Sequence, residues 1–364
     1  MRILVVTPWF PSASMPASGI FVEREVWALA GAHDVHVLHL DWQHTSGRET
    51  SATGSLRVTR LPLSRSRPID FVRARRAVRA AAQHADVVHT HAVTGLIPWR
   101  WPRSRPAALP WVHSEHWSGI TSPETLSRGA RIARRALLPL LRHPDVVVAE
   151  SGRLASAIRA VRSTPVEIVP CVVPEPDVTE APSTPPIRLV GVGAMIARKG
   201  PLLAAQTLEE LGRRGHDATL TWVGDGPQRA AVEEFARTAG LSPRVRLTGT
   251  LDQRGVSAEL QAANVFLLPT QGDNFCVVAA EALLNGRPVV SGAATGAVDY
   301  ARPEVSAFVS DQSAGAYADA VESVLASTAS LSARDIADTV TGRFTPGAVR
   351  GALDAVYATA RSLR

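Results

Sequence analysis

Short apolar, β-rich runs alternate with helical stretches along the whole chain, and this alternation constrains the fold more than any other feature. Helical segments between successive strands are typical of parallel α/β sheets. The predicted strands of the first half are Ile3–Thr7, Val35–Leu40, Arg57–Leu61, Val87–Thr90, Pro110–Ser114, Val146–Ala149 and Val166–Val169. Those of the second half are Ile187–Val192, Ala218–Val223, Val245–Thr248, Val265–Leu268, Pro288–Ser291 and Ala307–Val309.

The length and one Pro-rich passage predict how these elements divide into domains. A chain of 364 residues exceeds an ordinary single domain. Six prolines from Pro170 to Pro186 separate the two series of strands, and such a passage forms a semi-rigid hinge. We therefore expect an α/β protein with two Rossmann-like domains, residues 1–172 and 173–344, whose parallel sheets face a central cleft.

The sequence also favours a cytoplasmic location. Its apolar runs fall short of the ~18 residues of a membrane span. The N-terminal run Met1–Val6 is too short for the core of a signal peptide, and we interpret it as a first buried strand. The two cysteines, Cys171 and Cys276, lie far apart in the sequence and fit a reducing compartment.

The net charge of +6 is unevenly distributed. Residues 1–170 contain 22 arginines, 12 acidic residues and seven of the eight tryptophans, whereas residues 171–364 contain 17 basic and 21 acidic residues. A basic, Trp-rich half indicates an anionic partner, such as membrane headgroups, a phosphorylated acceptor or nucleic acid. A solvated, arginine-rich surface explains the same composition. The arginines over residues 73–79 and 128–142 fit either solvated amphipathic helices or helices adsorbed to a membrane.

Lysine is almost absent from the chain, and its single occurrence marks a loop. Of the 39 basic residues, only Lys199 is not an arginine. It lies in Val190–Gly200, which we interpret as a strand and a Gly-rich loop leading into a helix. Arg198 and Lys199 beside a helix N-terminus suit a diphosphate. Gly19, at the end of a Pro-rich loop before another helix, would also let a diphosphate approach, or serve as an ordinary turn glycine.

Two acidic residues bracket a second predicted anion site. Asp273 and Glu281 are separated by seven residues in a stretch that we interpret as strand end, polar loop, short helix and new strand. They face one ligand if Asp273 lies in the loop and Glu281 lies two turns inside the helix. The helix start between them offers free backbone N–H groups, which suit a phosphate. This layout predicts a phosphorylated sugar as ligand.

The histidines and the missing motifs limit the chemistry. His89 and His91 follow one predicted strand, and His113 and His116 follow another. Such pairs at strand ends are usually structural, and an Asp-x-Asp tripeptide for a Mg²⁺-bound diphosphate does not occur, so we expect no metal. His116 lies at a carboxyl strand end, where it would contact a sugar or form part of the core. Neither half opens with G-x-G-x-x-G, which counts against a dehydrogenase.

These residues together resemble the retaining glycosyltransferases of family 4, which have the GT-B fold. The resemblance covers nearly the whole chain, and the stretch from Asp273 to Glu281, similar to the family's E-x7-E element, is its most specific part. The other matching segments are Gly19, Asp86–His91, Ser114–His116, Ser151–Gly152, Val166–Val173, Lys199–Gly200 and Val223–Pro227.

The resemblance implies a role for each matching residue. Glu281 would bind the nucleotide ribose, and Lys199 would bind the diphosphate. His116 would touch the donor sugar near the reaction centre. The donor sugar and phosphate would be held by Asp273, Asn274, Phe275, Cys276 and Val277. The resemblance also implies retention, no metal, and a C-terminal helix, residues 345–364, that packs back on the first domain.

Three positions depart from the family pattern. Asp273 stands where Glu is usual, Cys276 replaces a common Gly, and Ala194 occupies the place of a second diphosphate-binding Arg. Our hypothesis is that Arg198 compensates for the missing arginine from the other side of the loop.

We therefore predict transfer of a hexosyl unit from a nucleotide diphosphate sugar, most often a UDP-sugar in this family, without a cofactor. The first domain would hold a cell-envelope, lipid-linked or natural-product acceptor, and its basic surface allows peripheral association with an anionic membrane. The alternatives are a nucleotide-sugar epimerase of the same fold and a basic membrane- or nucleic-acid-binding module. Nucleic acid is not expected, because Lys199, Asp273 and Glu281 all lie in the acidic half.

Overall fold

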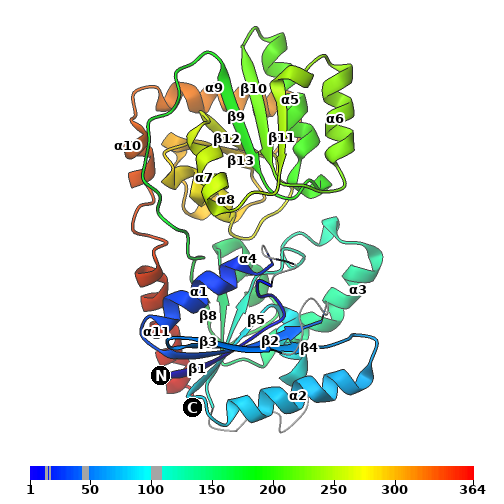
Figure 1. Cartoon of the computed structure of the whole chain (residues 1–364), viewed down its shortest axis with the longest axis vertical. Helices are drawn as coiled ribbons and strands as arrows, with labels where there is room; N and C mark the ends of the chain where they lie inside the picture. The colour runs from blue at the N-terminus through cyan, green and yellow to red at the C-terminus, as the bar shows by residue number, and fades with distance from the viewer. Residues whose placement is uncertain (13–14, 16–17, 43–48, 100–108) are drawn as a thin grey trace. The chain divides into compact units, whose positions relative to one another are not determined.

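The computed structural model describes residues 1–12, 15, 18–42, 49–99 and 109–364. Its residues form two compact units (Figure 1). Unit 1 comprises Met1–Val172 together with Phe344–Arg364, and unit 2 comprises Val173–Arg343. The C-terminal segment thus returns to the unit that contains the N-terminus.

Unit 1 is built on a sheet of eight described strands in the order β3-β4-β2-β1-β5-β6-β7-β8. The strands are β1 (Arg2–Thr7), β2 (Asp34–Asp41), β3 (Glu49–Thr53), β4 (Leu56–Pro62), β5 (Val87–His91), β6 (Trp111–Glu115), β7 (Val146–Ala149) and β8 (Val166–Ile168). All neighbours are parallel except β3, which pairs antiparallel with β4 at the edge. The sequence did not predict β3, because its five residues are all exposed and lack an alternating apolar pattern.

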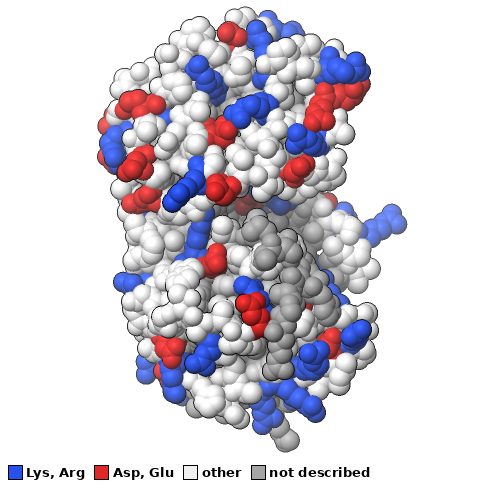
Figure 2. Space-filling model, in the orientation of Figure 1, with Lys and Arg blue, Asp and Glu red and all other residues white. Residues whose placement is uncertain are grey.

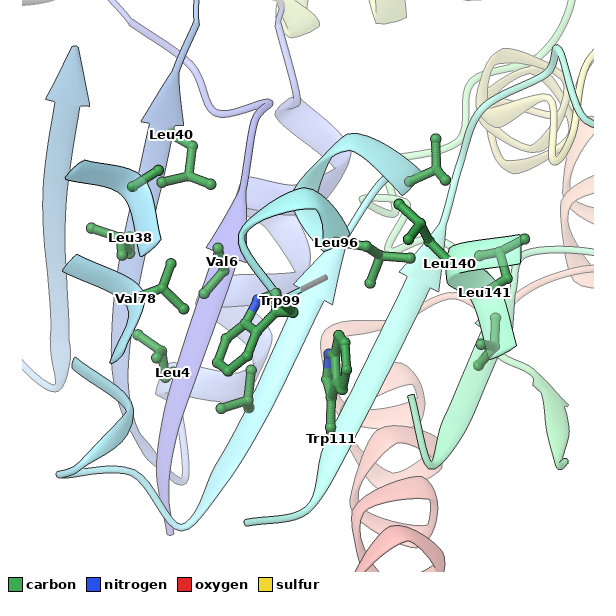
Figure 3. Close-up of a cluster of buried hydrophobic side chains, with 14 of the residues drawn as sticks. Leu4, Val6, Leu38, Leu40, Val78, Leu96, Trp99, Trp111, Leu140 and Leu141 are labelled. Carbon is green, nitrogen blue, oxygen red and sulfur yellow. The ribbon is translucent and has the colours of Figure 1, made fainter. Parts of the chain in front are cut away.

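Helices cover both faces of this sheet, because successive side chains of a strand point to opposite faces. On β1, Ile3 and Val5 pack in the core that includes α1 (Ile20–Ala30) and α11 (Pro346–Ser362). Leu4 and Val6 pack in the opposite core, shown in Figure 3. The elements over that second core are α2 (Pro68–Ala82), η1 (Val93–Trp99), η3 (Leu138–Arg142) and α4 (Gly152–Arg159).

The C-terminal helix α11 is capped at its start, and two side-chain contacts fix it to unit 1. Thr345 accepts a hydrogen bond from the N–H of Ala348 at 3.2 Å, and Pro346 occupies the first turn. Asp354 lies 2.7 Å from His33 Nε2, and Arg364 lies 2.6 Å from Asp145. Helix α11 packs against α1 (Figure 1).

Unit 2 is built on six described parallel strands in the order β11-β10-β9-β12-β13-β14. The strands are β9 (Ile187–Val192), β10 (Ala218–Val223), β11 (Val245–Gly249), β12 (Val265–Leu268), β13 (Val289–Gly292) and β14 (Ser306–Val309). The helices α5 (Pro201–Arg213), α6 (Arg229–Thr238) and α9 (Ala314–Thr328) form one group, and α7 (Gln253–Gln261), α8 (Val277–Leu284) and α10 (Ala333–Asp338) form another. The predicted pair of Rossmann-like domains is therefore confirmed.

The Pro-rich passage from residue 173 onward belongs to unit 2 and is anchored to it. The Arg287 side chain is fully buried and donates hydrogen bonds to the carbonyls of Thr179, Glu180 and Leu260 at 2.9, 3.3 and 3.1 Å. Glu175 accepts from the N–H of Gly342 at 2.7 Å. The sequence indicated a hinge for this passage, but these contacts show that much of it is held against unit 2.

The surface of unit 1 is rich in basic side chains, and Figure 2 shows several of them on one face. Its helix α3 (Arg128–Leu137) contains four arginines and buries none of its residues fully. Ile132, on this helix, keeps 68% of its surface exposed. Within the described part of the chain, every helix is too short or too polar to cross a bilayer.

Candidate functional site

The strand order of unit 2 predicts where a ligand binds. From β9 the chain moves outward through β10 and β11, and then returns to β12 on the other side of β9. Ligands of open α/β sheets bind at such a reversal, outside the carboxyl ends of the strands. Two loops leave these ends: residues 193–200 after β9 and residues 269–276 after β12. They contain Arg198, Lys199 and Asp273.

These two loops are joined by direct contacts. Lys199 Nζ forms an ion pair with Asp273 Oδ2, and Arg198 donates to the carbonyl of Gly272. The N–H of Gln271 donates to the carbonyl of Arg198 at 2.8 Å. Gly200 has a φ of 72°, and a Cβ there would lie 2.3 Å from the carbonyl oxygen of Pro269. Glycine at this position therefore permits the close approach that brings the charged residues together.

Asp273 links the charged loop to the start of helix α8. Its Oδ1 accepts the N–H of Cys276 at 3.0 Å, while its other oxygen faces Lys199. Burial opposes ionisation of this carboxyl, but Lys199, Arg198 and the Cys276 N–H together hold the pKa of Asp273 below its usual range. The Lys199 and Asp273 side chains are 14% and 21% exposed, so the ion pair is partly accessible to solvent.

Helix α8 begins with an unusual backbone conformation at Cys276. This residue precedes the helix with a φ of 63°, in the left-handed region that favours glycine. Its carbonyl accepts the Tyr300 hydroxyl at 2.7 Å, and burial raises the pKa of its thiol to about 12. The neighbouring Asn274 and Phe275 are buried, whereas Val277 is half-buried at the helix start. The glycine that is usual in the family at this position would adopt the same positive φ without strain.

Glu281 lies on α8 and lines a separate pocket. This pocket has a volume of about 410 Å³, and its walls come from residues 174–176, α7 and α8. The polar residues that line it with Glu281 include Glu175, Arg254, Ser257 and Asn285. Arg198, Lys199 and residues 273–277 are not among its lining residues. The structure therefore divides the predicted donor-site residues of unit 2 into a charged loop pair and the Glu281 pocket.

Gly19 and His116 both lie in unit 1. Gly19 begins α1 with a φ of 73°, and a Cβ there would lie 2.5 Å from the carbonyl carbon of Trp9. The backbone itself therefore requires this glycine. Positions 13–14 and 16–17 of the preceding loop lie outside the described residues.

His116 is held from both ring nitrogens inside unit 1. Its Nδ1 pairs with Glu150, and its Nε2 lies 3.0 Å from His91 Nδ1. The two imidazoles are stacked with centroids 5.3 Å apart, and the His116 side chain is 5% exposed. Burial opposes its positive charge, but the nearby carboxylate of Glu150 and those of Glu25 and Glu115 raise the pKa of His116. Its polar atoms thus face protein groups.

The residues around His116 include Glu25 and Glu150, which the sequence did not predict as site residues. Glu25 lies on α1 beside the buried residues Val22, Val26 and Leu29. A carboxylate on the inward face of an amphipathic helix is a detectable signal, because such a residue is seldom buried without a partner. Glu150 follows β7, and its distance in sequence from His116 concealed the contact.

Two family models match this chain, one in each unit. Residues 18–175 match the model described as Glycosyltransferase Family 4. Residues 186–327 match the model described as Glycosyl transferases group 1. The chain belongs to glycosyltransferase family 4.

Curated relatives of this family-4 protein align over parts of its length. One is 2-deoxystreptamine glucosyltransferase of Streptomyces kanamyceticus, 38% identical over 30% of this chain and 28% of the relative. Another is 2-deoxystreptamine N-acetyl-D-glucosaminyltransferase of Streptomyces fradiae, 28% identical over 67% of this chain and 66% of the relative. The alignments to the first two relatives span only about a quarter of their lengths (28% and 26%).

Solved structures share the whole fold at low sequence identity. Sucrose-phosphate synthase from Thermosynechococcus elongatus matches with a TM-score of 0.84 and 20% identity, covering 100% of both chains. Anabaena HepE, solved in complex with UDP and glucose, matches with a TM-score of 0.72 and 15% identity, covering 98% of this chain and 99% of that one. These likenesses show the GT-B fold of the family-4 protein.

Proposed function

We propose that this protein transfers a hexosyl unit from a nucleotide diphosphate sugar to an acceptor hydroxyl. The observation that carries the proposal is the Lys199–Asp273 pair, which lies where the strand order of unit 2 reverses and beside the start of α8. A cation and a helix N-terminus at this place suit a diphosphate, and a carboxylate beside them suits sugar hydroxyls. The family membership and a solved relative that holds UDP and glucose support the same donor class.

In this proposal, unit 2 binds the donor and stabilises the leaving diphosphate. Lys199 and the N–H groups at the start of α8 stabilise the negative charge that grows on the diphosphate as the glycosidic bond breaks. Arg198, already fixed against Gly272, adds charge from the same loop. The protein's own cations take the place of a metal, and the sugar is transferred with retention, the leaving diphosphate accepting the acceptor's proton.

The nucleoside half of the donor is assigned to the pocket of Glu281. A carboxylate in a pocket of about 410 Å³ suits the two hydroxyls of a ribose, and Ser257 and Asn285 add polar groups to its wall. We propose UDP as the nucleotide, in keeping with the UDP in the HepE structure.

Unit 1 is proposed to hold the acceptor, and the contact of His116 with the sugar stays a prediction. Both ring nitrogens of His116 contact protein groups, so its expected contribution is its ring face. The relatives' names include acceptors of two classes, 2-deoxystreptamine and phosphatidylinositol. We propose an acceptor from the natural-product or lipid-linked class and a cytoplasmic protein. The basic, exposed surface of α3 would bring it to an anionic membrane in the lipid case.

The epimerase alternative is not favoured, because the curated relatives described above are glycosyltransferases. A screen tests the proposal directly. Nucleotide sugars are tested for thermal stabilisation of the protein, and the stabilising donor is then incubated with 2-deoxystreptamine or with phosphatidylinositol vesicles.

We expect a UDP-sugar to raise the Tm, and a glycosylated acceptor to appear with release of UDP. Lys199→Ala should lose both effects, whereas Arg213→Ala, at a side chain 70% exposed on α5, should keep them. Isomerised donor formed without acceptor would support the epimerase, and stabilisation of Lys199→Ala equal to that of the parent would refute the site.

A further inference from the structure

A buried group of one carboxylate and two imidazoles lies inside unit 1. Glu25 comes from α1, and His89 and His91 come from β5, where alternate positions place both rings on the same face of the strand. Glu25 is 8% exposed and both histidines are fully buried. One potential ligand atom from each residue lies within 4.8 Å of the other two. Carboxylate oxygen and imidazole nitrogen are the donor atoms of many zinc sites.

Two of the three spacings between these atoms are close to those of a tetrahedral metal site. Glu25 Oε1 lies 3.4 Å from His91 Nε2 and 3.6 Å from His89 Nδ1. With metal–ligand bonds of roughly 2.0–2.1 Å, two ligand atoms of a zinc tetrahedron are about 3.3 Å apart. A zinc ion next to Glu25 Oε1 could therefore contact either imidazole nitrogen with a small shift of the side chains.

Two of the three atoms have no hydrogen-bond partner in the described structure. Glu25 Oε1 and His91 Nε2 are both buried, and neither forms a hydrogen bond. A buried carboxylate oxygen without a partner is strongly destabilising, and an imidazole lone pair facing it adds repulsion. A cation between the two atoms removes both penalties.

The opposite nitrogen of each imidazole already has a partner. His89 Nε2 lies 2.7 Å from Ser114 Oγ, and His91 Nδ1 lies 3.0 Å from His116 Nε2. His116 is in turn held by Glu150 through its Nδ1. Histidines that bind a metal usually donate the other N–H in this way, which fixes the ring and its tautomer. With these donors assigned, His91 Nε2 presents a lone pair toward Glu25, and His89 Nδ1 presents a lone pair that accepts the Tyr357 hydroxyl at 2.8 Å.

A hydroxyl of the C-terminal helix is hydrogen-bonded to this group. The Tyr357 hydroxyl of α11 lies 2.8 Å from His89 Nδ1 and is buried. The group therefore joins α1, β5 and α11, three elements far apart in the sequence.

We propose that Glu25, His89 and His91 bind a structural Zn²⁺ ion in unit 1, with the Tyr357 hydroxyl beside it. The ion would lie in unit 1 and not in the proposed donor site of unit 2. Its role would be to hold the helices α1 and α11 to the sheet at β5. The sequence suggested the two histidines but favoured a structural reading, because the spacing of residues 89 and 91 gave no sign that Glu25 would reach them.

The test uses the full chain freed of any affinity tag and dialysed against EDTA. Zinc is titrated by calorimetry, and the Tm is measured in EDTA and in buffered zinc at about 100 times the Kd. We expect one zinc per chain and a rise in Tm of roughly 5–10 °C. Cobalt in place of zinc should give the visible absorption of a tetrahedral site.

Glu25→Gln and the matched control Glu124→Gln complete the design, because Glu124 is an exposed carboxylate of unit 1. In EDTA, Glu25→Gln should be at least as stable as the parent, because an unpaired buried charge is removed. In zinc, the order should reverse, since only the parent and Glu124→Gln bind the ion. A parent protein that binds no stoichiometric zinc, or a zinc-induced Tm rise in Glu25→Gln equal to that of the parent, would overturn the proposal. The group would then be a proton-bound network.

Discussion

Two groups of charged side chains, one in each unit, differ in how exposed they are and in the direction in which their surroundings shift the pKa of a carboxyl group. In unit 2, the Lys199 and Asp273 side chains are 14% and 21% exposed and pair with each other at the strand ends. In unit 1, Glu25 and the histidines near it are buried, and burial raises the pKa of Glu25 to about 7. In unit 2, by contrast, burial acts against the charge of Asp273, but the charge of Lys199 helps to hold the pKa of Asp273 below its usual range.

This difference separates ligand binding from folding. Paired charges that solvent can reach can exchange a protein partner for a ligand, whereas buried charges exchange partners only at a large cost in desolvation. We therefore expect substitutions in the unit 2 pair to change activity more than stability, and substitutions in the unit 1 cluster to do the reverse. The following experiments test that contrast, from the largest expected effect to the smallest.

Lys199→Ala should lower kcat/KM by about 100- to 1000-fold, because a preorganised positive group at the leaving diphosphate is lost. The Tm should fall by an amount similar to that in Asp273→Asn, because the Asp273 carboxylate loses its partner. Lys199→Arg should recover part of the activity, since it restores the charge without the compact ammonium. Steady-state kinetics with the donor and acceptor found in the screen provide the measurement. A Lys199→Ala enzyme within threefold of the parent would place the diphosphate elsewhere.

Glu281→Ala should raise the donor KM by about 10- to 100-fold, because hydrogen bonds from ribose hydroxyls to a carboxylate are lost. Glu281→Gln should recover part of the affinity, because the amide oxygen still accepts. Glu175→Ala, in the same pocket, serves as the control. If Glu175→Ala weakens donor binding as much as Glu281→Ala, the pocket binds the nucleoside without a special role for Glu281.

Asp273→Asn should reduce stability in a pH-dependent way. The folded-state pKa of Asp273 lies below its value in the unfolded chain, so the ion pair stabilises the fold above the unfolded pKa. That contribution disappears as pH falls through the folded pKa. Urea unfolding at several pH values should therefore show a difference between parent and variant of about 1–3 kcal/mol at pH 7, shrinking in strong acid. A difference that grows in acid would show that the pKa shift has the opposite sign.

Cys276→Gly should be more stable than Cys276→Ala by about 1 kcal/mol. Both variants remove the buried thiol, but only glycine adopts the positive φ of this position without strain. At an ordinary helix position the order is reversed, which makes the comparison diagnostic. Equal stabilities in urea would mean that the helix start relaxes around alanine.

The sequence predicted the fold well because the relevant signals are local. The apolar runs of β1 and β9 and the glycine before α5 are recognisable within a few residues, and each predicted strand begins and ends within one residue of the observed one. The exposed edge strand β3 was missed because it carries no apolar pattern.

The site was only partly predictable, because its contacts join distant segments. The sequence placed Lys199 and Asp273 each at an anion site but did not reveal that they pair with each other across 74 residues. It identified His116 without its partners Glu150 and His91. The departure at Cys276 was visible, whereas its left-handed backbone became evident only in the folded chain.

The central claim, that the charged loops of unit 2 bind the diphosphate of a nucleotide sugar without a metal, is tested most directly by calorimetric titration in EDTA. UDP and UMP are titrated into the parent, Lys199→Ala and Arg213→Ala. We predict that the parent and Arg213→Ala bind UDP at least 10-fold more tightly than UMP, and that Lys199→Ala loses most of that preference. Equal affinity for UDP and UMP in the parent, or an unchanged preference in Lys199→Ala, would contradict the account.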